Sequence, residues 1–394
     1  MKQHLHRMAG LCLAVTLLLT AAGCGQQAVQ ESTTPSPVVE TTAVDKNDLT
    51  VVRSMELQYA NNFSVDYCAN GCKIITDGAG QKFLWLPEGG EVPDDTGDMT
   101  VLQAPLTKLG CFSTTHATLF HAIGALDKVS LVTTDKDKWY IEQVAQQIED
   151  GTTTYVGKNS APDYQLISAA APQIILISAN TMHGSDEVLA KLDELGIPYI
   201  ADSQHLENHP LGRVEWVKLV GALLDMEAEA DAYFDEEVRR VNAVAESVSG
   251  ESESPSILQT YIFKGTVYVR NGGDYVNKKL ELAGGTYPFA ELEPDQGGNT
   301  KMTGEEFYQG AVDADILIYD NTSDVSVSTV ADILANGDYL GDMKAIQEGN
   351  VWGIQKNYWQ SADDVATMIE DLATIIYHPE NADQLHYFYK LPAE

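Results

Sequence analysis

ENHPLGRVEWVKLVGALLDMEAEADAYFDEEVRRVNAVAESV, residues 207–248, is the stretch of sequence on which the fold depends. Its first part carries apolar side chains at helical spacing, which form one stripe: Trp216, Leu219, Val220, Leu223 and Leu224. Residues 226–249 contain neither Gly nor Pro, and they predict a helix roughly 35 Å long. We expect Asp225 to cap the start of this helix. Because strands and helices alternate on both sides of it, we interpret this helix as a connector between two α/β halves.

The residues before the connector predict a small β-rich segment (49–104) and then an α/β lobe (105–225). In the β-rich segment, strands are expected at 55–59, 73–76, 82–86 and 100–102. In the lobe, strands are expected at 109–112, 129–133, 173–178 and 198–201, and helices at 113–126, 139–149, 164–170 and 186–195. Apolar strands that alternate with helices indicate βαβ units and a mainly parallel sheet.

The same alternation returns after the connector, in residues 250–394. Strands are expected at 257–263, 266–270, 315–320 and 351–354, and helices at 275–283, 304–309, 330–336 and 361–377. The predicted fold class is therefore α/β, with two Rossmann-like lobes of mainly parallel sheet joined by one long α-helix (226–249). Ligands of such sheets bind at the carboxyl ends of the strands, so two facing lobes predict a binding cleft.

The N-terminus has the pattern of a secretory signal peptide (1–23), with two basic residues, an apolar run and then small residues. Ala21-Ala22-Gly23-Cys24 resembles a bacterial lipobox, which predicts lipid modification of Cys24; an ordinary signal with a chance cysteine is the alternative. Residues 24–48 are rich in Gln, Ser, Thr, Pro and Glu and predict a disordered tether. We therefore expect an extracytoplasmic protein that is lipid-anchored to the cell membrane.

Composition narrows the functional classes. The sequence has 24 basic and 58 acidic residues, a formal charge of −34, which argues against nucleic-acid binding. No G-x-S-x-G, H-E-x-x-H or P-loop motif occurs, so we expect no enzyme and no cofactor, with a tethered hydrolase as the alternative. Cys68 and Cys72 could form a small disulfide loop, a question that the sequence leaves open.

Several phrases, in a fixed order, resemble one known family. They are PDYQLISAAAPQIILIS (162–178), LDELGIPYI (192–200), HPLGRVEW (209–216), LAGGTYPF (282–289), EEFYQGAVDADILIYD (305–320) and YHPE (377–380). They are similar to segments of the helical-backbone (class III) substrate-binding lipoproteins of ABC importers, which capture ferric siderophores, haem or cobalamin. The resemblance implies a monomer whose partners are a metal chelate, a permease and the ATPase of that permease. It also implies docking on the permease through acidic residues, which fall on Glu306 with Glu305 beside it, and on Asp163, because position 165 is Gln.

Candidate ligand contacts follow from the expected strand ends and helix starts. In the first lobe they are Thr114, Thr115, His116, Lys136, Trp139, Tyr140, Asn180, His183, Glu207 and His209. In the second lobe they are Tyr261, Arg270, Tyr275, Tyr358 and Trp359. Aromatic rings beside cations suit an iron chelate or a flat macrocycle, although helix capping and core packing are the structural alternatives for these residues. The histidines at 183, 205 and 209 also leave open a direct zinc or manganese site.

Overall fold

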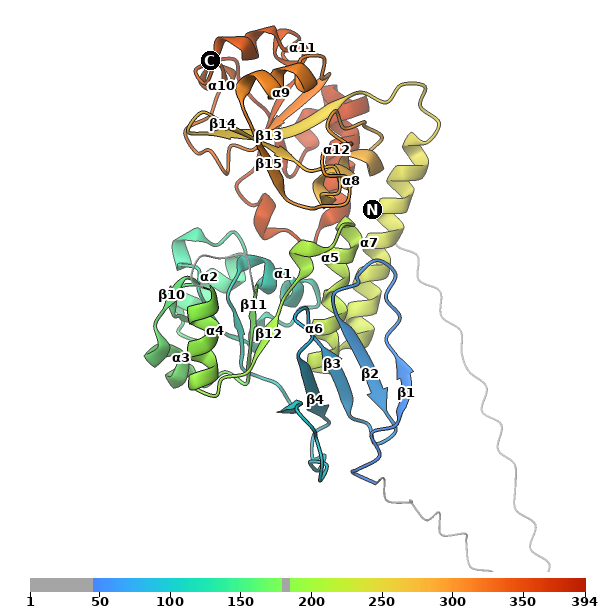
Figure 1. The fold of residues 1–394 in the computed structure, drawn as a ribbon, viewed down its shortest axis with the longest axis vertical. Coiled ribbons are helices and arrows are strands. Elements are labelled where there is room, and N and C mark those ends of the chain that lie inside the picture. The colour runs from blue at the N-terminus through green and yellow to red at the C-terminus, as the bar shows by residue number, and fades with distance from the viewer. Residues whose placement is uncertain (1–44, 179–184) are drawn as a thin grey trace, which may run out of the picture. The chain divides into compact units, whose positions relative to one another are not determined.

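The computed structural model describes residues 45–178 and 185–394, so the predicted signal peptide and most of the tether lie outside the described residues. The described part of the chain begins with a five-stranded sheet in the order β1-β2-β3-β4-β5 (Figure 1). Its strands are β1 (Val51–Ser54), β2 (Ser64–Cys68), β3 (Lys73–Thr76), β4 (Lys82–Leu86) and β5 (Thr100–Gln103). Cys68 and Cys72 are buried free thiols, and burial raises the pKa of both.

The strand predicted at 55–59 is wrong, because this stretch is the irregular connection between β1 and β2. Only the N–H of Met55 bonds to β2, at the Val65 carbonyl, whereas the N–H groups at the end of this stretch bond to carboxylates. Glu215 accepts from the backbone nitrogens of residues 58, 59 and 60, at 2.8–3.1 Å. Glu207 accepts from those of residues 61 and 62 at 3.1 Å, and from the Trp216 indole at 3.0 Å. These two acids fasten the β-rich segment to the first lobe.

The first lobe has a parallel sheet in the order β12-β11-β6-β7-β8, as the alternating pattern predicts. Its strands are β6 (Leu109–Cys111), β7 (Val129–Val132), β8 (Thr154–Tyr155), β11 (Ile174–Ile177) and β12 (Tyr199–Ala201), and a small hairpin joins β9 (Gly157–Lys158) to β10 (Ala161–Pro162). Its helices are α1 (Thr114–Ala122), α2 (Glu142–Glu149), α3 (Tyr164–Ala170) and α4 (Ser185–Glu194), with 3₁₀ turns η1 (Leu126–Lys128), η2 (Lys136–Lys138) and η3 (Gln204–Leu206). Two predicted helices are shorter than expected: α1 stops before Gly124, whose φ is +69°, and α2 starts only after the η2 turn.

The connector is not one continuous helix, because two shorter helices precede the long helix, which we call the rod. Helices α5 (Pro210–Glu215) and α6 (Val217–Leu224) precede the rod α7 (Glu227–Val248), which runs without interruption as predicted. The role expected for Asp225 is wrong. It lies in the left-handed region (φ +59°) and ends α6, whereas Met226 precedes α7 without a side-chain cap. The reversal is tight, because a Cβ on Gly221 would lie 2.7 Å from that of Ala230.

The second lobe has a six-stranded sheet in the order β15-β14-β13-β16-β17-β18, with a parallel centre of β13, β16 and β17 and antiparallel outer strands. The strands are β13 (Ile257–Phe263), β14 (Thr266–Arg270), β15 (Asn299–Met302), β16 (Ile316–Tyr319), β17 (Val351–Ile354) and β18 (Phe388–Lys390). Its helices are α8 (Tyr275–Leu282), α9 (Gly304–Ala311), α10 (Val330–Leu334), α11 (Lys344–Gln347) and α12 (Val365–Tyr377), with turns η4 (Asp338–Asp342), η5 (Tyr358–Gln360) and η6 (Pro379–Gln384). In the tight hairpin between β13 and β14, Lys264 and Gly265 both have positive φ, as a two-residue type I′ turn requires.

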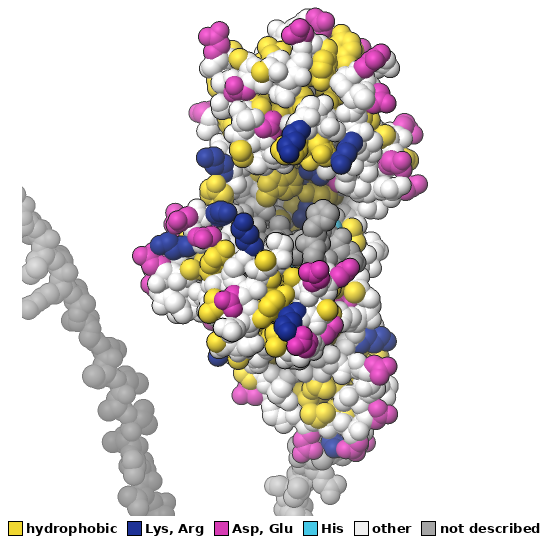
Figure 2. All heavy atoms as spheres, turned by 60° about the vertical axis from the view of Figure 1, so that its left-hand side comes forward, with side chains coloured by type: hydrophobic (Ala, Val, Ile, Leu, Met, Phe, Trp, Pro, Cys, Tyr) yellow, Lys and Arg dark blue, Asp and Glu magenta, His cyan; other side chains and the backbone are white. Residues whose placement is uncertain are grey.

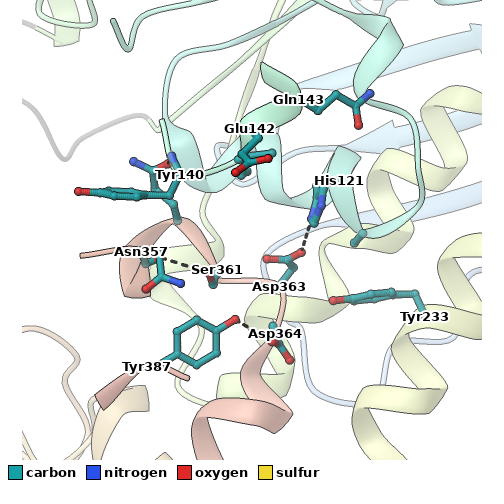
Figure 3. Close-up of a pocket in the computed structure, with 13 residues that line it drawn as sticks. His121, Tyr140, Glu142, Gln143, Tyr233, Asn357, Ser361, Asp363, Asp364 and Tyr387 are labelled. Atoms are coloured by element: carbon teal, nitrogen blue, oxygen red, sulfur yellow. Dashed lines mark hydrogen bonds and ion pairs between the residues drawn. The ribbon is translucent and has the colours of Figure 1, made fainter. Parts of the chain in front are cut away.

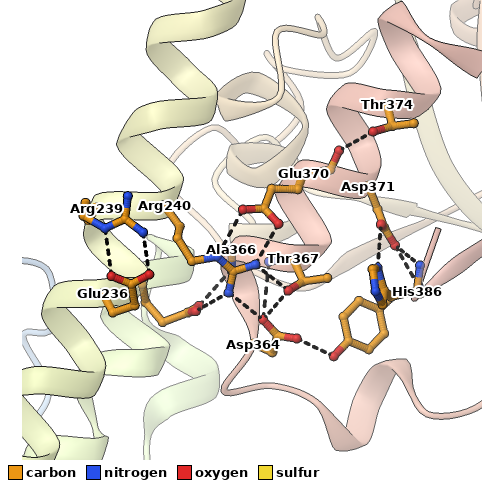
Figure 4. A network of polar contacts seen from close by, with 12 residues as sticks. Glu236, Arg239, Arg240, Asp364, Ala366, Thr367, Glu370, Asp371, Thr374 and His386 are labelled. Carbon is orange, nitrogen blue, oxygen red and sulfur yellow. Dashed lines mark hydrogen bonds and ion pairs between the residues drawn. The ribbon is translucent and has the colours of Figure 1, made fainter. Parts of the chain in front are cut away.

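A polar network fastens the rod to α12 (Figure 4). Arg240 donates to both carboxylate oxygens of Glu370, at 3.1 and 2.7 Å, and to Thr367 at 2.7 Å. The same guanidinium bonds to Glu237 at 3.2 Å, and Glu237 in turn accepts the backbone N–H of Ala366 at 2.9 Å. The rod therefore holds the second lobe through charged groups. Within the described residues, no helix is long and apolar enough to cross a membrane.

Candidate functional site

The two lobes meet through a few polar contacts. Gln360, at the end of η5, accepts from the backbone N–H of Tyr140 at 2.8 Å and donates to the carbonyl of Lys138 at 2.7 Å. Behind this bridge, His121 at the end of α1 contacts Asp363 at 3.3 Å. Asp363 raises the pKa of His121, and burial raises the pKa of Asp363. One glutamine and one titratable pair are thus among the contacts that link the facing lobes.

An open cleft lies on one side of this bridge, at the carboxyl ends of β16 and β17. Its volume is about 590 Å³, and it is lined by Tyr140, Asn321, Ile354, Gln355, Lys356, Asn357 and Tyr389. Asn321 follows β16 and holds the end of β17 by accepting from the backbone of Ile354 at 2.9 Å. The indole of Trp359 donates to Thr322 at 2.7 Å, which fixes the ring beside the strand ends. This is the position in which open α/β sheets bind ligands.

A second hollow lies on the other side of the bridge, against the rod. Figure 3 shows Tyr233 of α7 pointing into it, with the His121–Asp363 contact at its floor. It encloses about 540 Å³, and its other polar linings include Glu142, Asn357, Ser361, Asp364 and Tyr387. Tyr387 donates to Asp364 at 2.7 Å. Carboxylates outnumber cations here, which distinguishes this hollow from the rest of the lobe interface.

The first-lobe face of the interface is formed by strand-end loops. Thr114 lies with Ser113, Thr133 and Lys138 around a hollow of about 340 Å³ at the ends of β6, β7 and β8. Ser113 caps α1 by accepting from the backbone of Thr115, the structural alternative noted for this motif. His116 lies beneath this surface: it is fully buried, with its Nε2 3.0 Å from Ser178 Oγ, and burial lowers its pKa.

Other first-lobe candidates have structural partners. Lys136 pairs with Glu149 at 3.1 Å, and the buried Trp139 donates its indole N–H to Thr134 at 3.0 Å. His209 caps α5 and stacks on Tyr59 at 4.5 Å between ring centroids, and burial lowers its pKa to about 4. Glu207, a candidate ligand contact, is buried, and its carboxylate accepts from residues 61, 62 and 216. Asn180 and His183 lie outside the described residues.

Four of the second-lobe candidates form one cluster, and the fifth stands apart. Tyr358 and Trp359 meet edge to face at 4.8 Å, Arg270 lies 5.6 Å from the Trp359 ring, and Tyr275 starts the adjoining helix α8. Tyr261 instead stacks on Tyr268 at 4.6 Å.

Two cations that the sequence analysis missed complete this cluster. Arg213 of α5 lies 4.1 Å above the Tyr275 ring, and Lys279 of α8 bonds to the Tyr358 hydroxyl. Both belong to helices whose neighbouring positions are buried. The burial of those positions is visible only in the structure, so no signal in the sequence marked these two cations.

The predicted docking acids are all exposed. Asp163 caps α3, and Glu306 forms a capping box with Thr303 at the start of α9, which lowers the pKa of Glu306. Glu305, next to it, makes no hydrogen bond or ion pair with any residue the structure describes. No group of three or more His, Cys, Asp or Glu side chains suited to a metal occurs in residues 45–178 and 185–394.

The chain matches known proteins in both sequence and fold. Residues 111–358 match the model of the family described as periplasmic binding protein. An uncharacterised lipoprotein of Methanocaldococcus jannaschii is 29% identical, over 98% of this chain and 95% of its own. A possible iron-binding (periplasmic solute-binding) protein of Staphylococcus epidermidis superposes with a TM-score of 0.56 at 16% identity, covering 69% of this chain and 98% of that one. The periplasmic haem-binding protein of Vibrio cholerae gives 0.56 at 14% identity, covering 69% and 99%.

Proposed function

The chain belongs to the periplasmic binding protein family, and on that premise we propose that it captures a metal chelate between its lobes and delivers it to the permease of an ABC importer. The chelate classes are a ferric siderophore, haem or cobalamin. The observation that carries this proposal is the open cleft at the carboxyl ends of β16 and β17, faced by Tyr140 of the other lobe. A space of about 590 Å³ lies within the range of small-molecule sites.

The charge of the cleft supports an anionic or metal-bearing solute. The chain carries a formal charge of −34, yet Lys and Arg side chains gather on both sides of the hollow between the lobes in Figure 2. Trp359 and Tyr140 add aromatic surface near the strand ends, and Tyr140 is 49% exposed. Flat aromatic surface beside cations favours stacking of a macrocycle or a catecholate.

Anchoring and docking complete the proposal. Lipid attached to Cys24 would hold the body at the membrane through the segment 24–48, in keeping with the lipoprotein name of the Methanocaldococcus jannaschii relative. Glu305 and Asp163 would meet cationic groups of the permease, one from each lobe. Of the two glutamates on α9, Glu305 is the better suited, because the carboxylate of Glu306 is already bonded to Thr303.

Tryptophan fluorescence tests the ligand assignment. Trp359 is partly exposed beside the cleft, whereas Trp85 is buried between the β-rich segment and α6. Titration with a ferric catecholate, a ferric hydroxamate, haemin and cyanocobalamin should give saturable quenching with at least one of them. The quenching should fall in Trp359→Phe and persist in the matched control Trp85→Phe. Absence of any quenching or thermal shift with all four would refute the proposed function.

A further inference from the structure

Arg213 is a buried cation for which the described part of the chain offers no ionic partner. The residue is only 8% exposed, and its Nε is a buried nitrogen that finds no hydrogen-bond acceptor among the described residues. No described carboxylate lies within ion-pair distance of the guanidinium, which lies over the face of the Tyr275 ring, at 4.1 Å. Leaving a buried charge unpaired is costly, so this arrangement points to a group that arrives from outside.

Two further basic residues, Lys279 and Arg270, lie close to Arg213. Arg213, Tyr275 and Lys279 line one small cavity together with Tyr358 and Trp359. Lys279 is 2% exposed and bonds to the Tyr358 hydroxyl. Arg270, whose side chain is 14% exposed, faces Trp359 and has one distant partner, Asp274, at 3.8 Å. The charges of two carboxylates, Asp274 and the buried Asp320, act on Arg270. Among the described residues neither is an ion-pair partner of Arg213 or Lys279, so the three basic side chains outnumber the carboxylates near them.

We propose that Arg213, Arg270 and Lys279 form a receptor for a carboxylate group of the bound solute. This rests on the proposed function and narrows it to chelates that carry free carboxylates. A guanidinium fork matches a carboxylate in two parallel hydrogen bonds, and the unused Nε of Arg213 is one such donor. The cavity, about 20 Å³, has room for about one water-sized group, which suits the head of a single carboxylate and not a whole ligand.

The receptor spans the two lobes. Arg213 belongs to α5, on the first-lobe side, while Arg270 and Lys279 belong to the second lobe. A carboxylate between them would therefore draw the lobes together as it binds. Burial and the two guanidinium groups hold the pKa of Lys279 well below its usual value, and an anion at this position would raise it again.

The test compares Arg213→Met, which keeps an unbranched chain over Tyr275, with Arg213→Lys and with the control Arg239→Met. Arg239 is an exposed arginine of the rod, and within residues 45–178 and 185–394 its one partner is Glu236. The probes are ferric citrate and haemin, which carry carboxylates, and ferrioxamine B, which carries none. We expect the natural chain to bind a carboxylate probe, Arg213→Met to bind it about tenfold or more weakly, Arg213→Lys to lose less, and Arg239→Met to match the natural chain.

Each result decides one of the two proposals. Binding of ferrioxamine B alone, or equal affinities in Arg213→Met and Arg239→Met, would overturn the carboxylate receptor and leave chelate capture standing. If no chelate binds, chelate capture falls, and iron-free citrate then tests the receptor by itself. Thermal stabilisation of the natural chain by citrate but not of Arg213→Met supports the receptor, and no stabilisation refutes it.

Discussion

Replacing Glu215 by alanine should loosen the attachment of the β-rich segment to the first lobe. The carboxylate of Glu215 is fully buried and accepts from the backbone nitrogens of residues 58, 59 and 60 at 2.8–3.1 Å. It also lies 3.3 Å from the ammonium of Lys218. Alanine leaves these donors without an acceptor, in a place that water reaches poorly.

The size of the effect follows from these contacts. A hydrogen bond to a charged acceptor contributes about 1.5–3 kcal/mol, and burial of the carboxylate offsets part of the gain from three of them. We therefore expect the free energy of unfolding to fall by about 3 kcal/mol. In a body of this size, with an unfolding entropy of about 2.1 cal/mol/K per residue, the melting temperature should drop by about 4 °C. Glu215→Gln keeps one acceptor oxygen and should lose roughly half as much.

Hydrogen exchange and thermal melting measure this prediction together. The amides of residues 58–60 should exchange much faster in Glu215→Ala, while the sheet of the second lobe keeps its protection. Glu246→Ala, a change at an exposed position near the end of the rod, is the control and should leave both readouts within error. A loss below about 1 kcal/mol with unchanged exchange at residues 58–60 would refute the reasoning.

Three further changes test the bridge, the rod and the docking acids. Gln360→Ala removes both hydrogen bonds to residues 138 and 140 and should shift the equilibrium between closed and open lobes toward the open state by about tenfold. The shift should appear as lower energy transfer between dyes on the two lobes. The control Gln309→Ala should leave the transfer unchanged, and an unchanged transfer in Gln360→Ala would contradict the prediction. Burial raises the pKa of Glu237 to about 7, so the folded protein keeps this proton between pH 4.5 and 7 while the unfolded chain releases it. The stability of the natural chain should therefore fall by about 3 kcal/mol as pH rises through that range, whereas in Glu237→Gln the curve measured by urea unfolding should be flatter by that amount. Glu305→Gln should leave ligand affinity and melting temperature unchanged but reduce stimulation of the transporter ATPase, and equal stimulation would remove Glu305 from the docking surface.

The spacing of apolar residues and the positions of Gly and Pro predicted most of the fold, because both depend on the local conformation of the chain. The strands 73–76, 82–86, 257–263, 266–270 and 351–354 have the predicted bounds. The predictions fail where residues distant in the sequence determine the local conformation. Residues 55–59 alternate like a strand, but the N–H groups of residues 58 and 59 bond to Glu215, which lies 157 and 156 positions away. Asp225 has the composition of an N-cap, yet the reversal between α6 and α7 requires the left-handed conformation there.

The residues of the candidate site also divide into those that the local pattern predicted and those that depend on tertiary packing. Tyr275, Tyr358, Trp359 and Arg270 follow strand ends or begin helices, so the layout was enough to propose them. Arg213 and Lys279 lie inside helical segments, where the sequence cannot distinguish a cation at the surface from one turned toward a facing lobe. Glu207 and His209 were assigned to the cleft because they precede an expected helix start. Three-dimensional packing gives them backbone donors and a ring to contact instead.

The attachment of the β-rich sheet also determines which part of the body takes mechanical load. The first strand, β1, is an edge strand paired to β2, and the connection between them is held by Glu215 and Glu207 of the first-lobe side. If the chain is pulled through its N-terminal end, tension passes along β1 into the sheet and then into α5 and α6. The second lobe stands outside this path and is joined to it by the rod and the lobe contacts. A pull on the N-terminal end would therefore load the β-rich sheet and the first lobe before it reached the contacts between the lobes.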